Sequence, residues 1–215
     1  NSISGEVLPG VLSGCTALVS LNLSSNHLKG AFPPDITLLA SLSYLNLSNN
    51  NFSGELPGDE LAGLPRLSWL TLSLNHFHGS MPDSLGRLAN LRMLDFSSNE
   101  LSGAIPSSLC PNTGSKSKLE VLYLQNNYFT GGIPATISNC ESLESLDLSL
   151  NYINGSIPTS VGSLARLRDL CGSSVASLVA FPCHPVLAEP RQSVGRMCTT
   201  APEPVRLAPA IYRHP

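Results

Sequence analysis

Leucine and other apolar residues recur along this chain in an alternating pattern that is followed each time by a turn and a second, shorter apolar segment. The clearest copy, residues 119–134, reads L-x-x-L-x-L-x-x-N-x-φ-x-G-x-φ-P, where φ is a large apolar residue. Alternation of period two predicts a short strand in each L-x-x-L-x-L segment, with the leucine side chains directed into a core. Full copies begin at Leu18, Leu42, Leu67, Leu91, Leu119 and Leu143.

An asparagine follows each predicted strand, and the intervals between successive asparagines are 24, 25, 24, 28 and 24 residues. A nearly fixed period in this range predicts a solenoid in which each repeat packs only on its neighbours. Each asparagine is expected to turn the chain and to hydrogen-bond, through a buried amide, to backbone groups of adjacent turns. The six members of this asparagine ladder are Asn26, Asn50, Asn75, Asn99, Asn127 and Asn151.

Glycine and proline late in each copy predict that the chain returns along the opposite side of the solenoid. Segments there, such as residues 82–91, are typical of single helical turns with inward leucines. The predicted fold class is therefore an α/β solenoid. A curved parallel sheet lines its concave face, and short helical turns lie on its convex side.

The pattern covers residues 1–170: a partial first repeat, six full repeats and the start of a seventh. Residues 171–215 contain seven prolines and no repeat asparagine, which predicts an extended, disordered segment. A sequence read past an exon boundary or frame change is the favoured interpretation, with a genuine disordered tail or an irregular cap as alternatives. Because residue 1 falls in the middle of a repeat, the sequence is expected to be a fragment. No apolar run approaches the roughly 20 residues of a membrane span.

Composition and motifs narrow the function classes. Only 13% of the residues are charged and the net charge is −3, which argues against nucleic-acid partners. The sequence lacks a P-loop, H-E-x-x-H, G-x-S-x-G and kinase signatures, so we expect no enzymatic activity and no cofactor in this chain. His76 and His78 flank Phe77, which takes an inward position, so solvated turn histidines are expected there rather than metal ligands.

The G-x-φ-P half of the repeat resembles the plant extracellular type of leucine-rich repeat. That type occurs in receptor kinases and in secreted inhibitors of enzymes that degrade cell walls. Several longer segments resemble the middle of the ectodomain of plant brassinosteroid receptors, and the similarity covers about residues 1–170. Its most specific part is the lengthened repeat between Asn99 and Asn127, which contains Ser108-Leu-Cys-Pro-Asn112. The other segments are residues 122–134, 138–140 and 145–158.

This resemblance implies a single-span plasma-membrane receptor with a cytoplasmic serine/threonine kinase and a co-receptor kinase as partner. In brassinosteroid receptors the hormone lies between later repeats and an island domain, and this chain has no island, span or kinase. We therefore expect an extracellular scaffold fragment that does not itself bind the steroid. The alternative is a soluble, secreted binding module, either a decoy or an inhibitor of wall hydrolases, although the Cys-rich caps usual in such inhibitors are absent.

Protein or peptide partners are expected on the concave face, where strand side chains point to solvent. Tyr44 and Trp69 fall in the same column of adjacent repeats and make a plausible contact, since aromatic residues lead interface hot spots. Ordinary cross-strand packing on a solvated sheet is the competing interpretation. The candidate contact residues are Tyr44, Trp69, Thr71, Arg92, Asp95, Tyr123 and Asp147.

Modification sites and cysteines complete the sequence hypotheses. Four N-x-[ST] motifs are candidate glycosylation sites, and the first two occupy outward strand positions that should be sterically available. Cys110 lies one repeat before Cys140, so these two residues could form a disulfide in an oxidising compartment. Cys15 occupies the same repeat position as Cys140, where a small buried thiol packs well. Cys171, Cys183 and Cys198 could make one further bridge. The four glycosylation candidates are Asn22, Asn46, Asn51 and Asn154.

Overall fold

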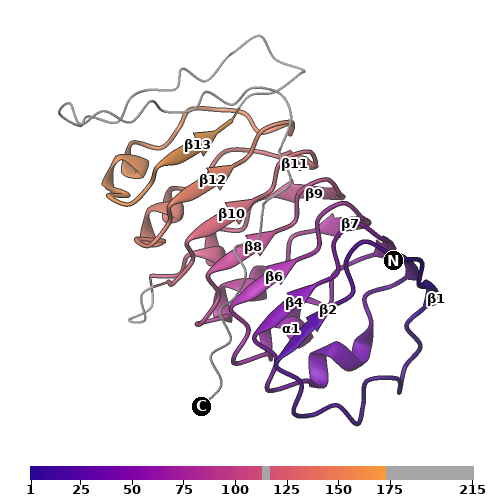
Figure 1. Cartoon of the computed structure of the whole chain (residues 1–215). Coiled ribbons are helices and arrows are strands. Elements are labelled where there is room, and N and C mark those ends of the chain that lie inside the picture. Colours follow the sequence, from indigo (N-terminus) through magenta and orange to yellow (C-terminus); the bar gives the residue numbers. More distant parts are fainter. Residues whose placement is uncertain (113–116, 173–215) are drawn as a thin grey trace. The chain divides into compact units, whose positions relative to one another are not determined.

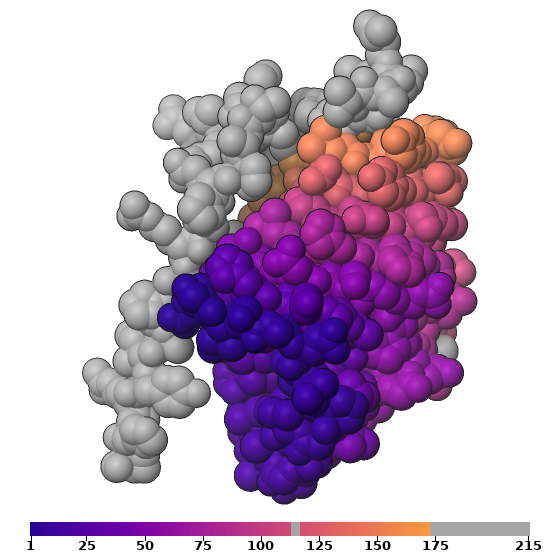
Figure 2. All heavy atoms as spheres, turned by 90° about the vertical axis from the view of Figure 1, so that its right-hand side faces the viewer, coloured from indigo at the N-terminus to yellow at the C-terminus, as the bar shows by residue number. Residues whose placement is uncertain are grey.

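A computed structural model describes residues 1–112 and 117–172 of the chain, and all structural statements refer to these residues. Most repeats add one strand to each of two parallel sheets and one helical turn between them, although the repeat that begins at Leu143 adds no strand to the smaller sheet (Figure 1). Repeats that follow one another in sequence are neighbours in space, which a space-filling view shows as successive bands of colour (Figure 2). The leucine-rich-repeat solenoid predicted from the sequence is confirmed.

The larger sheet has seven parallel strands, and its solvent-facing side is the predicted concave face. The central leucines are in register across the sheet, as Leu45 with Leu70 and Leu70 with Leu94, and these three are fully buried. The last strand includes Cys171, one residue beyond the predicted end of the repeats. The strands are β2 (Ser20–Asn22), β4 (Tyr44–Asn46), β6 (Trp69–Thr71), β8 (Met93–Asp95), β10 (Val121–Tyr123), β12 (Ser145–Asp147) and β13 (Asp169–Cys171).

A second parallel sheet of six strands follows the asparagine ladder. The sequence analysis did not predict it, because each strand carries at most one buried residue, and so short a pattern cannot be told from a turn. The partial first repeat supplies the first of these strands. They are β1 (Ser4–Glu6), β3 (His27–Gly30), β5 (Asn51–Gly54), β7 (His76–Ser80), β9 (Glu100–Ala104) and β11 (Tyr128–Thr130).

Short helices occupy the convex side, as predicted. Each begins directly after a proline, whose fixed φ suits entry into a helix. Each buries at least one apolar side chain, for example Leu85 in η2 and Val161 in η5. The elements are η1 (Pro34–Leu38), α1 (Gly58–Ala62), η2 (Asp83–Arg87), η3 (Ser107–Leu109), η4 (Ala135–Asn139) and η5 (Thr159–Ser163).

A disulfide joins Cys110 to Cys140, with their Cα atoms 5.4 Å apart and both residues buried. It links two adjacent repeats beside the segment that makes one repeat 28 residues long. Cys15 is exposed, so its expected burial is wrong. Residues 1–14 supply only half a repeat to pack over it, whereas a full repeat covers Cys140. The suggested bridge among Cys171, Cys183 and Cys198 involves residues outside the described part of the chain.

No helix among the described residues is long and apolar enough to cross a membrane.

Candidate functional site

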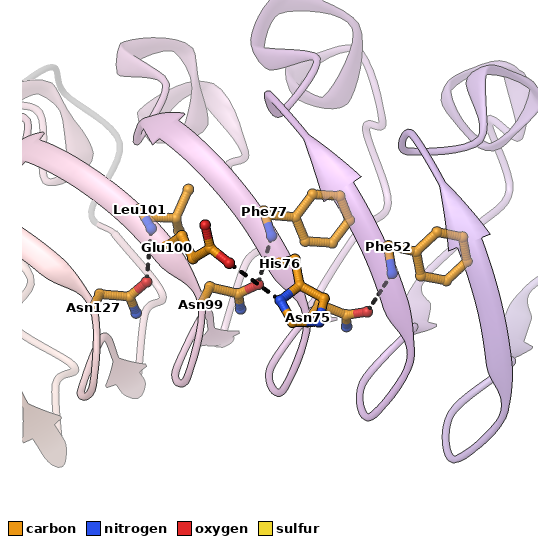
Figure 3. A network of polar contacts seen from close by, with 8 residues as sticks. All are labelled: Phe52, Asn75, His76, Phe77, Asn99, Glu100, Leu101 and Asn127. Atoms are coloured by element: carbon orange, nitrogen blue, oxygen red, sulfur yellow. Dashed lines mark hydrogen bonds and ion pairs between the residues drawn. The ribbon is translucent and has the colours of Figure 1, made fainter.

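The asparagine ladder fixes the strand ends from which the concave side chains project. The Oδ1 atom of Asn75 accepts a hydrogen bond from the backbone N–H of Phe52 at 3.0 Å. Its Nδ2 atom donates to the carbonyl oxygens of Leu47 and Leu72, each at 3.0 Å. One amide therefore ties its own turn to both sheets of the preceding repeat. Figure 3 shows the same N–H contact repeated at Asn75, Asn99 and Asn127.

The residue before each ladder asparagine has a left-handed backbone, with φ between 53° and 58°. Sequence reasoning missed this feature, although serine or asparagine at four of the six positions was an available signal. Leu74 and Leu150 adopt the same conformation and are 55% and 44% exposed. The six residues are Ser25, Asn49, Leu74, Ser98, Asn126 and Leu150.

An aromatic platform lies on the concave face at β4 and β6. Tyr44 and Trp69 are register partners, and their rings stack with centroids 5.8 Å apart and planes inclined by 27°. Both residues are half-buried, so parts of the rings remain open to solvent. The indole Nε1 of Trp69 is buried and has no hydrogen-bond partner among the described residues. Met93, next in the same column, is buried at the end of the platform.

Two carboxylates continue the concave face beyond this platform, in the neighbouring column of the sheet. Asp95 and Asp147 are separated by Tyr123, with which both are in register. The Oδ1 atom of Asp95 accepts bonds from the backbone N–H and the hydroxyl of Ser97. Asp147 makes the equivalent pair of bonds with Ser149. These short-range bonds hold both carboxylates in fixed orientations before any ligand arrives.

The electrostatic balance of the concave face is negative near these carboxylates. Arg92 forms an ion pair with Glu120, and Arg168 lies 3.6 Å from Glu144. Exposed pairs of this kind contribute at most about 1 kcal/mol to stability. They nevertheless place a carboxylate beside each of these two arginine charges. Asp95 and Asp147 therefore leave the face complementary to cationic or hydrogen-bond-donating groups.

Two residues predicted to be accessible on this face are buried. Thr71 is 6% exposed, because its short side chain lies below its neighbours and donates a hydrogen bond to the Oδ2 of Asp95. Asn46 is 8% exposed, and its amide bonds to Ser48 and Tyr44. The predicted availability of Asn46 for glycosylation is therefore wrong. Asn22, Asn51 and Asn154 are exposed.

The histidine pair lies on β7, an interior strand of the six-stranded sheet, and a second aromatic pair lies at the last strand of that sheet, β11. Phe77 is fully buried, as expected from its inward position, and the Nδ1 of His76 lies 3.1 Å from the Oε1 of Glu100 (Figure 3). In the part of the chain that the structure describes, no group of three or more His, Cys, Asp or Glu side chains could hold a metal ion. Tyr128 and Tyr152, which sequence reasoning did not single out, stack with centroids 6.1 Å apart.

Comparison with known proteins gives matches to repeat families. A leucine rich repeat model matches residues 117–171, and a second leucine rich repeat model matches residues 17–39, 41–60 and 90–112. No curated protein matches the sequence significantly.

Several solved plant receptor structures are similar to this chain. The plant peptide hormone receptor RGFR1 in complex with RGF2 is 32% identical, over 81% of this chain and 27% of that chain, with a TM-score of 0.75. The Arabidopsis receptor kinase HAESA, in complex with the peptide hormone IDA and the co-receptor SERK1, is 35% identical over 79% of this chain and 27% of that chain, with a TM-score of 0.71. Pollen Receptor Kinase 3 is 33% identical, over 80% of this chain and 77% of that chain, with a TM-score of 0.57.

The chain thus spans 27% of the length of each of the first two structures and 77% of the third. The repeat pattern, the two parallel sheets and these sequence identities all indicate the same family. The chain belongs to the leucine-rich-repeat family, in the form found in the ectodomains of plant receptor kinases.

Proposed function

We propose that this chain is a peptide-binding segment of the extracellular part of a plant receptor kinase. The observation that carries the proposal is the aromatic platform of Tyr44 and Trp69, which lies on the concave face beside oriented carboxylates. RGFR1 and HAESA were solved with peptide ligands, which supports a peptide rather than another class of ligand.

The proposed roles follow from the chemistry of each side chain. Tyr44 and Trp69 offer large rigid surfaces with few rotatable bonds, so a ligand that stacks on them loses little side-chain entropy of the receptor. Asp95 and Asp147 are assigned to a basic side chain or an amine of the peptide. Tyr123, between them, is proposed to form a hydrogen bond with the peptide. Arg92 is proposed to bind an acidic group of the peptide, which would compete with Glu120 for the guanidinium.

The parent protein is proposed to be a membrane receptor serine/threonine kinase that pairs with a co-receptor kinase. HAESA was solved together with the co-receptor SERK1, which supports such a partner. We assign no catalytic activity and no cofactor to the residues of this chain. Catalysis would belong to the kinase domain of the parent.

A closer relationship to brassinosteroid receptors is a second candidate, favoured by one observation. The 28-residue repeat carries Cys110 within Ser108-Leu-Cys-Pro-Asn112, the segment on which that resemblance is most specific. Under this candidate the chain is scaffold only, and a brassinosteroid is expected to leave the fluorescence of Trp69 unchanged.

The peptide proposal can be tested with the chain's own fluorophore, because Trp69 is its single tryptophan. Linear peptides selected from a phage-displayed random library on the purified chain are titrated against it. We expect a saturable change in tryptophan emission and at least about tenfold weaker binding by Tyr44→Ala, as for the loss of an aromatic hot spot.

Leu38→Ala is the matched control, since Leu38 is 66% exposed on the convex side. Its affinity for the selected peptides should equal that of the wild-type chain. Peptides that bind without changing the emission of Trp69, and equally well to Tyr44→Ala, would show that the concave platform is not the site.

A further inference from the structure

We propose that Asn154 carries an N-linked glycan whose first sugar packs on the exposed ring of Tyr152. The residues Tyr128, Tyr152 and Asn154 together form what we call the glycan seat. The proposal rests on the extracellular placement proposed above, but it does not depend on the peptide ligand or on the concave face.

The backbone directs Tyr152 and Asn154 to the same side. The N–H groups of Tyr152 and Asn154 donate to the carbonyl oxygens of Phe129 and Gly131, each at 2.8 Å, so this segment runs extended beside β11. In an extended segment, residues two apart point to the same face and their Cα atoms are about 6.6 Å apart. Ile153 packs against the core, which places its two neighbours outward.

The stacked tyrosines leave an apolar surface uncovered beside the attachment point. Tyr128 and Tyr152 are 49% and 54% exposed, with ring planes inclined by 17°. The faces of aromatic rings carry partial negative charge. A pyranose ring presents axial C–H groups with partial positive charge, so a sugar is a chemically suitable cover. A glycan on Asn154 starts within one sugar length of this surface.

Two of the other sequons, Asn46 and Asn51, lack this combination. Asn46 is buried and its amide is committed to Ser48 and Tyr44, so a glycan there is incompatible with the folded repeat. Asn51 is exposed and occupies the repeat position equivalent to Tyr152, but its register partner is Lys29. It is therefore an accessible sequon without an aromatic neighbour in register, which makes it a matched control.

The modification is the transfer of an oligosaccharide from a lipid-linked diphosphate donor. A bond forms between the Nδ2 of Asn154 and C1 of the first sugar. The bond from C1 to the diphosphate oxygen breaks, the lipid diphosphate leaves with the electron pair, and the proton lost by the amide passes to water. Asn154, Gly155 and Ser156 are all exposed, so the whole acceptor motif is accessible on the folded surface.

The first test is glycopeptide mapping of the full chain, expressed behind a cleavable secretion signal in insect cells. We expect Asn154 to carry a glycan and Asn46 to be unmodified. An unmodified Asn154 would overturn the proposal.

The second test asks whether the attached sugar packs on Tyr152, and it compares the melting temperatures of glycosylated variants. Asn154→Gln should lower the melting temperature of the wild-type chain by a few degrees and should have little effect in a Tyr152→Ala background. Asn51→Gln should have the same effect in both backgrounds. Equal shifts for Asn154→Gln in both backgrounds would overturn the packing.

Neither result bears on peptide binding, which the fluorescence of Trp69 tests separately on protein that carries no glycan. Failure of the glycan seat and failure of the proposed function are thus distinguishable.

Discussion

The amide of each ladder asparagine can join adjacent repeats because it is a hydrogen-bond donor and acceptor at once. In Asn75 the oxygen receives one backbone N–H, while the nitrogen faces the carbonyl oxygens of Leu47, Leu72 and Ser73. Aspartate would place a negative charge against these carbonyls, and glutamine would hold its amide one methylene too far away. The sequence was sufficient to predict this role, because an asparagine at the same place after every strand meets the same unpaired backbone groups each time.

Asn75→Ala should lower the free energy of unfolding by about 3 kcal/mol, because several buried backbone groups lose their partner at once. Urea denaturation of the variant and the parent chain measures the difference. The exposed Asn51, replaced by alanine in the same way, should change stability by less than about 0.5 kcal/mol. Equal losses for the two variants would show that the ladder bonds contribute nothing beyond a surface asparagine.

The burial of individual concave side chains was harder to predict. The alternating pattern identifies which positions face away from the core, and Thr71 and Asn46 do so. Whether such a residue reaches solvent depends on the size of its neighbours in the sheet, as Tyr44 beside Asn46 and Asp95 beside Thr71 illustrate. The exposure of such a residue therefore depends on particular pairs of side chains in adjacent strands. The repeat pattern of one strand does not contain these pairs.

At the scale of single elements, helical turns of adjacent repeats approach closely on the convex side. A Cβ atom added at Gly86 in η2 would lie 1.9 Å from the backbone oxygen of Ser108 in η3. Gly162 occupies the same place in η5, and a Cβ there would meet nothing within 4 Å. The two glycines are equivalent in the repeat, yet only Gly86 has a neighbouring helical turn stacked against it in the described part of the chain.

Gly86→Ala should destabilise the chain by about 3 kcal/mol or more, since backbone rather than a flexible side chain must move to admit the methyl group. Gly162→Ala should be neutral or stabilise by about 0.5 kcal/mol, because alanine restricts the unfolded chain. Thermal or urea unfolding of the two variants gives the comparison. A mild effect at Gly86 would mean that η2 and η3 separate easily.

The strands of the second sheet could not be predicted from the local sequence pattern. In β5, only Phe52 is fully buried before the chain reaches Gly54. Local pattern cannot separate such a segment from a loop. The strand exists because the preceding and following repeats offer it backbone partners, so its stability is a property of the stack rather than of the segment.

At the scale of the whole solenoid, burial falls toward both ends of the described repeats. Leu45, Leu70 and Leu122 are 0% exposed, whereas Leu21 is 9% exposed and Leu170 is only partly buried. A solenoid held by interfaces between neighbours loses its outer repeats first.

Hydrogen exchange should therefore be slowest in the repeats from Leu42 to Leu148 and faster in β1, β2 and β13. Mass spectrometry on peptic fragments resolves these segments. Uniform protection from β2 to β13 would contradict the nearest-neighbour picture and indicate one cooperative unit. The disorder predicted for residues 171–215 concerns, apart from residues 171 and 172, residues outside the described part of the chain.

The lengthened repeat has a consequence for how a gene of this kind changes. Its extra residues fall between η3 and β10, beside the Cys110–Cys140 bridge, where neither sheet requires a fixed count. Within the strands and the ladder, by contrast, adding or removing one residue would misplace every later hydrogen bond. Lineages that inherit this scaffold are therefore free to duplicate or delete whole coils, or to enlarge this junction. Changes of one or a few residues within the strands or the ladder should be eliminated by selection.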